Sequence, residues 1–544
     1  MMRGFVQGHL FVAHLWRWRY SIDMEVSSMK RAIVILASTL LLLLAACGGS
    51  TTPSLTVSPT SVTVTAGDGP VSFSATLSGA SGAISWNLSP NLGTLSSNSG
   101  PSVSYTPPAT VATEQTVTLT ASAAGLNANA TITIEPRKTD VNGVVTDLSG
   151  NPLSGKKVFI PGHQLQTTDD EGKFSFSNVV VPYTVIVEYS SSQYDVYEGL
   201  TRSDPRISAG NGLAGGPYGA QVYGSVSNTT SGNKLGIQGA GEGCMFARII
   251  DSSADNTSYD ASVSLYKKTC NLDVYALEWA NDVYDNAANF VSLGKRADVA
   301  LVDNGNFHGI DIQLSQLNAP TTHDLSVTLS PPSSLTPAME EAIVKLSPAG
   351  VPASGVPTAS FNTTNTMVTF KSPNINSVSD ARMTVWGAFT DSDDNSSMAW
   401  DTVPVSSNSI TIGVPEPPAI SEPANNTTGV TPATNFAWSG PDDAFYFVEF
   451  RHSNSFVVYI YTAAKQTHLP DLSAFNVNYP SNASFDVQVV GYNINGIYES
   501  DPDQFTDPNK LPPGIAFGLA YFGSPLSDSG FILGSKKISV TTAN

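Results

Sequence analysis

Apolar and polar residues alternate in short runs along the chain from residue 55 onward. Such runs occupy positions 55–57, 62–64, 71–75, 117–121 and 132–134, and Gly, Pro, Ser and Asn separate them. Because successive side chains of a strand point to opposite faces of its sheet, a period of two predicts half-buried strands. Short strands with frequent turns are typical of β-sandwiches, so we expect an all-β chain built as a tandem array of β-sandwich domains.

The segment before residue 55 has a different pattern. Met29, Lys30 and Arg31 form a short basic head, and the apolar run 32–44 follows it. This run is too short for a permanent membrane-spanning helix, which needs roughly 20 apolar residues. A basic head, a short apolar core and small residues before a cleavage point are the marks of an export signal. We therefore predict a signal peptide at residues 29–46.

The last residues of that signal carry a more specific pattern. The run Leu44-Ala45-Ala46-Cys47 resembles the lipobox of bacterial lipoproteins. The resemblance implies cleavage before Cys47, attachment of a diacylglycerol to its thiol and acylation of its amine, as with palmitate. One acyl chain anchors weakly, at about 0.8 kcal/mol per buried methylene, whereas two or three hold a protein on a membrane. The alternative is an uncleaved anchor helix or an unmodified cysteine.

The neighbours of Cys47 refine this expectation. Gly48 stands where an acidic residue often retains such proteins in an inner membrane, so the outer membrane or cell surface is favoured. Residues 47–54 are expected to form the anchor and a linker. Residues 1–28 resemble no part of an export signal, and we expect that they come from a start codon placed too early, with Met29 or Met24 as the true start.

Charge narrows the range of partners. The chain has 26 basic and 45 acidic residues, and residues 1–46 hold five of the former and two of the latter, so the processed chain carries a net charge of −22. Such a field disfavours nucleic acid and anionic membrane surfaces as partners. The expected partners are the membrane, through the lipid anchor, and an envelope or extracellular protein or glycan.

Cys244 and Cys270 are the two cysteines that remain once Cys47 is assigned to lipid. In an exported protein such a pair is most simply a disulfide. Closing this loop would contribute roughly 3 to 4 kcal/mol to stability. A metal site is the alternative, but it would need two or more further ligands, and the nearest histidine in sequence is His308.

Residues 55–136 are predicted to form the first sandwich. The pattern Ser-Pro-x-Ser-Val-x-Val at 58–64 resembles the start of a bacterial immunoglobulin-like domain, and Trp86 stands where such a domain buries an aromatic ring between its sheets. The intersheet cysteine pair of antibody domains is missing. The resemblance implies a fold and says little about a ligand.

Residues 137–207 resemble a carboxypeptidase regulatory-like domain, a small prealbumin-like sandwich. The resemblance rests on the Gly-Val-Val-Thr-Asp run from Gly143, the turn around Pro152, and the segment 167–176. We expect Val158 and Ile160 to point inward and the Asp170-Glu-Gly172 sequence to form a hairpin turn. In that family the domain is not catalytic and accompanies enzymes, receptors and surface proteins.

The middle of the chain gives weaker signals. A Gly-rich linker is expected at 208–217, a second prealbumin-like sandwich at 218–318, with one apolar face on the strand 274–279, and a further sandwich at 319–414. A short helix is predicted at 337–345.

Residues 415–505 resemble a fibronectin type III-like domain. Its pattern includes Trp438, expected in the core, and an alternation over 446–450 that would pair with 485–489. The Pro- and Gly-rich residues 506–544 are expected to form a C-terminal tail.

No catalytic constellation stands out in the sequence. It lacks a Gly-x-Ser-x-Gly elbow, a His-Glu-x-x-His helix and a phosphate-binding Gly-rich loop, so we expect no enzymatic activity and no cofactor. The only weak metal candidates are Asp391, Asp393 and Asp394, whose alternating oxygens suit a hard cation such as Ca²⁺. The sixth position of this loop is not Gly and the twelfth is Thr402, so an EF-hand is excluded and a solvated acidic turn is the main alternative.

Three classes of function remain. The leading one is a surface-anchored, non-catalytic lipoprotein that serves as a binding, adhesion or structural scaffold of the cell envelope. The second is a carbohydrate-binding or nutrient-capturing lipoprotein, which an exposed coplanar pair among Trp279, Trp386, Trp400 and nearby tyrosines would favour. The third is a hydrolase with a hidden site in residues 218–414.

Overall fold

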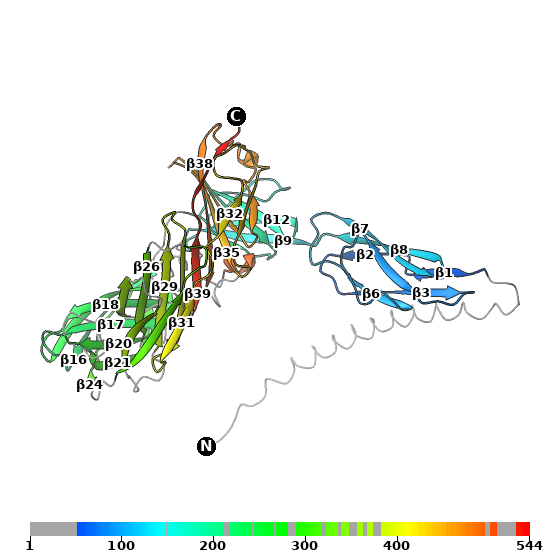
Figure 1. Cartoon of the computed structure of the whole chain (residues 1–544). Helices are drawn as coiled ribbons and strands as arrows, with labels where there is room; N and C mark the ends of the chain where they lie inside the picture. The colour runs from blue at the N-terminus through cyan, green and yellow to red at the C-terminus, as the bar shows by residue number, and fades with distance from the viewer. Residues whose placement is uncertain are drawn as a thin grey trace, which may run out of the picture. The chain divides into compact units, whose positions relative to one another are not determined.

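The computed structural model describes most of the chain from residue 52 onward, and the chain divides into two compact units. The described residues are 52–147, 150–210, 218–241, 244–265, 268–280, 290–316, 322–335, 339–347, 356–362, 367–373, 382–453, 455–494, 501–508 and 529–544. Unit 1 ends at Glu135, and unit 2 holds Pro136–Asn544 together with Thr110–Glu114. The fold is all-β, an array of β-sandwiches, as the alternation predicted (Figure 1).

Unit 1 is a sandwich of two four-stranded sheets. One sheet has the order β1 (Ser54–Ser58), β3 (Val71–Ser78), β6 (Ser102–Thr106) and β5 (Thr94–Leu95). The other has the order β2 (Ser61–Thr65), β8 (Leu126–Glu135), β7 (Gln115–Ala123) and β4 (Ser85–Ser89). The inward residues of the alternating runs form the core, and Trp86 is 4% exposed, which confirms its predicted place between the sheets.

Unit 2 contains four modules, which we name by their order in the chain. Module A is 136–210, module B is 218–316, module C is 322–414, and module D is 415–494 together with 529–544. Each of modules A, C and D has one sheet of its own with three strands. These are β12 (Lys173–Val180), β9 (Lys138–Thr146) and β15 (Arg206–Ser208) in A; β28 (Met367–Pro373), β25 (Thr322–Ser330) and β31 (Ser409–Gly413) in C; and β32 (Ala419–Glu422), β34 (Asn435–Ser439) and β37 (Gln466–His468) in D.

The second sheets of modules A, C and D are joined into one 14-stranded sheet. Its order is β11 (Gln166–Thr167), β10 (Lys157–Phe159), β13 (Tyr183–Ser190), β14 (Gln193–Leu200), β36 (Phe456–Thr462), β35 (Phe445–His452), β38 (Ser484–Ile494), β39 (Gly530–Gly534), β30 (Ser396–Pro404), β29 (Arg382–Thr390), β26 (Met339–Ser347) and β27 (Val356–Asn362). Two further strands, β33 (Thr427–Val430) and β40 (Ile538–Thr542), join it beside β38.

Module D, the last in sequence, is the centre of this sheet. Its strand β36 pairs in parallel with β14 of module A, and its strand β39 pairs antiparallel with β30 of module C. Figure 1 shows β39, in red, beside the yellow and green strands of module C. Because the strands β36 and β39 are paired with strands of other modules, neither presents a free edge at these seams.

The pairing of β39 and β40 with β38 corrects the prediction for the C-terminus. Residues 506–544 were expected to form a tail outside the fibronectin-like domain, yet Gly530–Gly534 and Ile538–Thr542 supply its last strand in two pieces. The sequence between β38 and β39 includes the four-residue helix α2 (Pro502–Phe505). The long insertion separates the strand from its sandwich in sequence, which hid the connection.

Other local predictions for modules A and D are confirmed, and one in module C is wrong. Val158 and Ile160 are buried, Trp438 is 4% exposed, and β35 pairs with β38 so that Val448 faces Val489. The helix predicted at 337–345 is instead strand β26, paired on both sides by β27 and β29. Tertiary pairing overrides the helix propensity of its Glu, Ala and Leu residues.

Module B is built from nine strands in one continuous sheet. They are β22 (Asn306–Phe307), β16 (Tyr218–Ser227), β19 (Asn256–Leu265), β18 (Cys244–Asp251), β17 (Lys234–Gly241), β20 (Thr269–Trp279), β21 (Phe290–Val302), β24 (Ser315–Gln316) and β23 (Ile312–Gln313), which pairs with β16. Strands β18 and β19 share only two residue pairs, so the sheet folds there into two layers around one core.

Strand β20 ties module B to the rest of unit 2. Leu272 and Val274 face the core of module B, while Tyr275, Leu277 and Trp279 belong to a second core cluster. That cluster draws buried residues from all four modules. The prediction of one apolar face on this strand is therefore wrong, because both faces are buried.

No helix among the described residues is long and apolar enough to span a bilayer.

Candidate functional site

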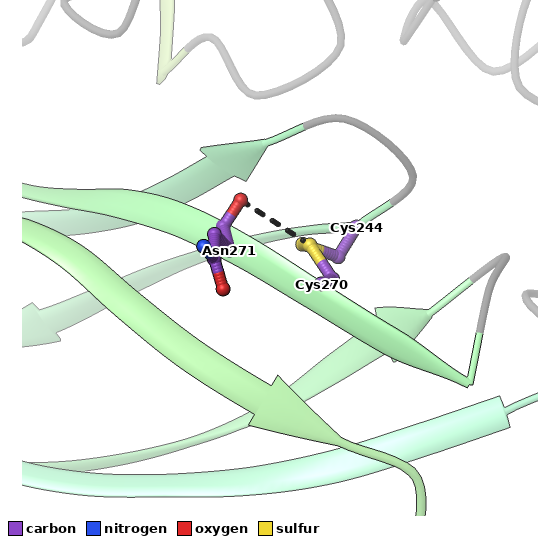
Figure 2. The surroundings of a disulfide bond; sticks show 3 residues. All are labelled: Cys244, Cys270 and Asn271. Atoms are coloured by element: carbon purple, nitrogen blue, oxygen red, sulfur yellow. Dashed lines mark hydrogen bonds between the residues drawn. A yellow bond between two sulfur atoms is a disulfide. The ribbon is translucent and has the colours of Figure 1, made fainter. Parts of the chain in front are cut away.

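The predicted site residues lie in different parts of the chain. Cys47, the predicted lipid attachment point, is outside the residues that the structure describes. Cys244 and Cys270 are joined by a disulfide, with their Cα atoms 6.1 Å apart (Figure 2). Both β18 and β20 pair with β17, so the bond links the two neighbours of β17 near its end at Gly241.

Gly241 lies beside the disulfide, where the backbone of Asn271 approaches it closely. A Cβ on Gly241 would lie 1.9 Å from the backbone oxygen of Asn271. Only glycine leaves room for the backbone beside the disulfide. The bond is thus part of the frame of module B.

The acidic loop of module C is a hydrogen-bonded turn. Asp391 accepts bonds from the backbone N–H of Asp393 at 2.8 Å and of Asn395 at 3.0 Å, and from Asn395 Nδ2 at 2.8 Å. Burial alone would raise the pKa of Asp391, but these bonds lower it overall. Asp393 forms an ion pair with Lys536 at 2.8 Å, and Asp394 has the left-handed conformation of a turn residue, φ 63°.

The carboxylates of Asp391 and Asp393, two of the three weak metal candidates, thus have partners within the protein. Within the described part of the chain, no group of three or more His, Cys, Asp or Glu side chains is placed to hold a metal ion.

The tryptophans named as candidates for a sugar platform are all buried. Trp279 is 0% exposed, Trp386 1% and Trp400 2%. A sugar-binding platform needs an accessible ring face, so these three rings do not form one.

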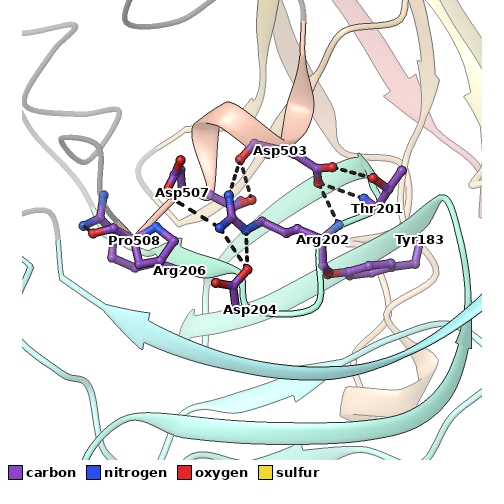
Figure 3. Close-up of polar contacts among 9 residues, drawn as sticks. Tyr183, Thr201, Arg202, Asp204, Arg206, Asp503, Asp507 and Pro508 are labelled. Carbon is purple, nitrogen blue, oxygen red and sulfur yellow. Dashed lines mark hydrogen bonds and ion pairs between the residues drawn. The ribbon is translucent and has the colours of Figure 1, made fainter. Parts of the chain in front are cut away.

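Beside the seam between modules A and D, the segment that follows β38 makes polar contacts with module A. Helix α2 and the residues after it, 501–508, form what we call the latch. Asp503 of the latch accepts bonds from Thr201 N at 2.8 Å, Thr201 Oγ1 at 2.5 Å and Arg202 N at 3.1 Å. Arg202 Nη1 donates back to the Asp503 carbonyl oxygen at 2.9 Å, and Figure 3 shows Arg202 extended between Asp503 and Asp507.

The latch is also held by apolar packing and by a local signal in its sequence. Phe505 stacks on Phe445 with ring centroids 3.6 Å apart, and both rings are buried. Asp501 caps the helix by accepting from Asp503 N, and Pro502 opens it. Asp followed by Pro is a helix-start signature. That signal was visible in the sequence, but its partner at Thr201 was not.

The same seam buries a carboxyl group. Asp195 on β14 is 0% exposed and lies beside Tyr459 in the register of β14 with β36. Gln193 Nε2 donates to Asp195 Oδ2 at 3.2 Å, while Oδ1 has no partner among the described residues. Burial raises the pKa of Asp195 to about 8, although bonds from Gln193 and Gly210 offset part of the effect. Asp195 is therefore mostly protonated at neutral pH.

The seam between modules C and D contains a pocket of about 390 Å³, which we call the seam pocket. Its walls come from β30, β31, β39, the end of β38 and the loop before β35. The lining residues are Ala399, Trp400, Asp401, Thr411, Ile412, Gly413, Asp443, Asn493, Ser529, Gly530 and Phe531. Because these elements belong to two modules, the pocket exists only where β30 and β39 are paired.

Gly530 lets the two walls of the seam pocket approach. A Cβ on Gly530 would lie 2.5 Å from both the Asn493 carbonyl oxygen and Cζ2 of Trp400. Asn493 Nδ2 donates to the carbonyl oxygen of Asp443 at 2.9 Å and to its carboxylate at 3.3 Å, which orients that acid. Sequence reasoning missed this site because its residues come from several separate segments between Ala399 and Phe531.

A second pocket, of about 440 Å³, lies in module D alone. The loop 469–481, Val430–Pro432 and the residues 542–544 line it. Its walls combine buried leucines, such as Leu469 and Leu472, with the carboxylate of Asp471.

Comparisons with known proteins give no family for this chain. No protein-family model matches it, and no curated protein sequence matches it.

Similar solved structures include a candidate cell adhesion protein of Parabacteroides distasonis, with 9% identity and TM-score 0.13 over 34% of this chain and 79% of that one. The pilus adhesin SpaC of Lactobacillus rhamnosus GG shares 10% identity with TM-score 0.14 over 72% of this chain and 56% of that one. The major pilin subunit BcpA of Bacillus cereus shares 7% identity with TM-score 0.11 over 51% of this chain and 99% of that one. Similarity this low carries no argument about function.

Proposed function

We propose that this protein is a non-catalytic scaffold of the bacterial cell envelope and is lipid-anchored through Cys47. The scaffold binds or adheres to an extracellular protein or glycan. The lipobox-like run before Cys47 supports the anchor and the outer surface as its location. The net charge of −22 after processing argues against nucleic acid as a partner.

The observation that carries the scaffold role is the shared sheet of unit 2. Three sandwiches contribute strands to one 14-stranded sheet, and one hydrophobic core cluster includes residues of all four modules. Modules linked by flexible joints would move independently, whereas backbone pairing across the seams opposes such motion. A stiff body with its own binding surfaces is suited to bearing load and to presenting ligands at a fixed geometry.

The second class, a carbohydrate-binding lipoprotein, gains no support from the tryptophans, since all three are buried. No specific contact in the described residues of 218–414 favours a hydrolase over a scaffold.

The anchor and the adhesive role are tested separately. Metabolic labelling with a palmitate analogue is expected to mark the wild-type protein and to fail for Cys47→Ala. Beads coated with the processed chain are expected to bind envelope or host-surface preparations, and glycan arrays separate protein from sugar ligands. A labelled protein whose beads adhere to nothing would contradict the adhesive role and leave the anchor intact.

A further inference from the structure

Strand β18 of module B has a free edge over most of its length. It pairs with β17 throughout, but with β19 only over its first two residues. The residue directly after β18, Ser252, donates its backbone N–H to the carbonyl oxygen of Asn233 at 2.8 Å. Bonded and non-bonded pairs alternate in an antiparallel ladder, so this contact shows which residues of β18 bond to β17. The backbone groups of Ala247, Ile249 and Asp251 therefore point to the free edge.

The side chains along this edge permit the approach of another strand. Ile249 is 44% exposed and is one of three exposed large apolar side chains among the described residues. Arg248 forms an ion pair with Asp260 at 3.2 Å. Asp251 forms one with Lys234 at 2.6 Å. An edge strand that must stay unpaired usually carries a free charge, a proline or a bulge. Strand β18 contains no proline, and both of its charges are already paired within module B.

The free edge is complementary to itself. When a second copy lies antiparallel with Ile249 on the two-fold axis, Ile249 faces Ile249 of the other copy, and Ala247 faces Asp251. Each of these pairs can exchange two N–H···O bonds, because all three residues turn their backbone groups outward. The two isoleucines then cover each other, and no acid faces an acid. Arg248 lies opposite Ile250 of the other copy, where its aliphatic stem can pack.

The chain already joins its own sandwiches by pairing edge strands. Strand β36 pairs with β14, and β39 pairs with β30, each across a boundary between modules. A two-fold pair occupies the same edge of both copies, so assembly stops at a dimer. We infer that two copies of this protein associate through the edge 247–251 of β18 as an antiparallel, two-fold pair. This inference goes beyond the proposed function and depends on neither the lipid anchor nor the adhesive role.

Ile249→Pro tests the edge directly. It removes a backbone N–H that points away from β17 and that the two-fold pair uses, and proline is tolerated on edge strands. Ser258→Pro on β19 is the matched control. Asn228 donates its N–H to the Asp255 carbonyl oxygen at 2.8 Å, so by the same alternation Ser258 turns its backbone away from β16. Both variants lose one outward N–H, but only the first lies in the inferred contact.

The experiment is analytical ultracentrifugation of the processed chain with Cys47→Ala over a range of concentrations. We expect a reversible equilibrium between monomer and dimer. Ile249→Pro should raise its dissociation constant by about tenfold or more, and Ser258→Pro should leave it unchanged.

Added cysteines test the register of the pair. On oxidation, Ile249→Cys should form a disulfide-linked dimer, because Cα atoms of a bonded pair lie about 5.5 Å apart, within reach of a disulfide. Ala247→Cys should link to Asp251→Cys when the two variants are mixed, and neither should link to itself.

Several results would overturn the inference. They are a chain that stays monomeric throughout, a dimer that Ile249→Pro leaves unchanged, equal weakening by both proline variants, or Ala247→Cys that links to itself as in a parallel pair. A thermal melt of each variant shows whether the fold is intact. The cysteine variants keep the test valid if proline disturbs β18.

Discussion

Unit 1 and module D are both two-layered sandwiches, yet they handle their sheet edges in opposite ways. In unit 1, each four-stranded sheet ends in its own edge strands, β1 and β5 in one sheet and β2 and β4 in the other. In module D, the strands β36 and β39 are paired with β14 and β30 of other modules. The first sandwich is complete without other modules, and the second is part of a larger sheet.

This difference teaches how an array of similar modules becomes one body. Exposed edges usually need devices that prevent pairing with other chains. Unit 2 uses its own modules instead, and places the last one in the middle so that it joins a module on each side. The consequence is that local changes at a seam should affect several modules together, whereas changes in unit 1 should remain local.

The largest effect is expected from removing residues 529–544. This truncation deletes β39 and β40, so β38 and β30 lose their shared neighbour and module D loses its last strand. We expect unit 2 to lose cooperative folding while unit 1 keeps its own thermal transition. Calorimetry with limited proteolysis measures both. A unit 2 transition that survives the truncation would contradict a central role for module D.

The next largest effect concerns the disulfide of module B. Replacing Cys244 and Cys270 together with Ala opens a loop whose ends are 26 residues apart. The chain-entropy estimate gives a loss of about 3 to 4 kcal/mol. Because module B shares a core cluster with the other modules, denaturant unfolding should show the loss in the unit 2 transition. Unit 1, whose described residues contain no cysteine, is the internal control. An unchanged unit 2 transition would mean that the bond adds nothing to stability.

A smaller loss is expected at the latch. Asp503→Ala leaves Thr201 N and Arg202 N without their acceptor, which should cost about 2 kcal/mol. Asp507→Ala is the matched control, because Asp507 contacts Arg202 at 3.7 Å and an ion pair of this kind contributes less than about 1 kcal/mol. Hydrogen exchange of the amides of Thr201 and Arg202 measures the opening of the seam. Equal effects of the two variants would show that the hydrogen bonds of Asp503 stabilise the seam no more than the ion pair of Asp507 does.

Replacing Asp195 is expected to stabilise the protein at high pH, whereas the substitutions above destabilise it. Its pKa is about 8 in the folded chain and near 3.8 in the unfolded one, so the unfolded state releases the proton first. The free energy of unfolding should therefore fall as pH rises from about 4 to about 8, and stay level above that. Asp195→Asn removes this loss and should raise the melting temperature by a few degrees at pH 8 and above, and change it little at pH 4.

Gln193→Ala is a useful companion variant, since it removes a bond to Asp195 and keeps the acid. It should retain the decline with pH. A flat wild-type profile over this range would show that Asp195 is more hydrated than its burial suggests.

These features show which parts of the structure the sequence could predict. Alternation identified five of the eight strands of unit 1 and the pairing of the segment 446–450 with the strand that contains 485–489, because both depend on patterns within one module. Strand β26 was mistaken for a helix, since its Glu and Ala residues favour helices and only its neighbours β27 and β29 make it a strand.

The candidate sites followed the same rule. The cysteine pair was recognisable from its count and setting, and the turn at Asp391 from its composition. The seam pocket and the contact of Asp503 with Thr201 join residues from distant segments, and no local pattern encodes such a meeting. The insertion between β38 and β39 also hid the last strand of module D.

The smallest losses of stability are expected when a buried tyrosine is replaced with phenylalanine, once in each unit. Tyr105 in unit 1 and Tyr446 in module D are both 0% exposed, and each donates its hydroxyl to a backbone oxygen, of Leu92 at 3.0 Å and of Pro441 at 2.6 Å. Replacing either with Phe keeps the ring and leaves that oxygen with one donor fewer, at a cost of about 1 kcal/mol. Tyr105→Phe should lower only the unit 1 transition. Tyr446→Phe should lower the whole unit 2 transition, because the core cluster that contains Tyr446 reaches all four modules. If Tyr446→Phe instead split off a separate transition for module D, the shared sheet would not make unit 2 cooperative.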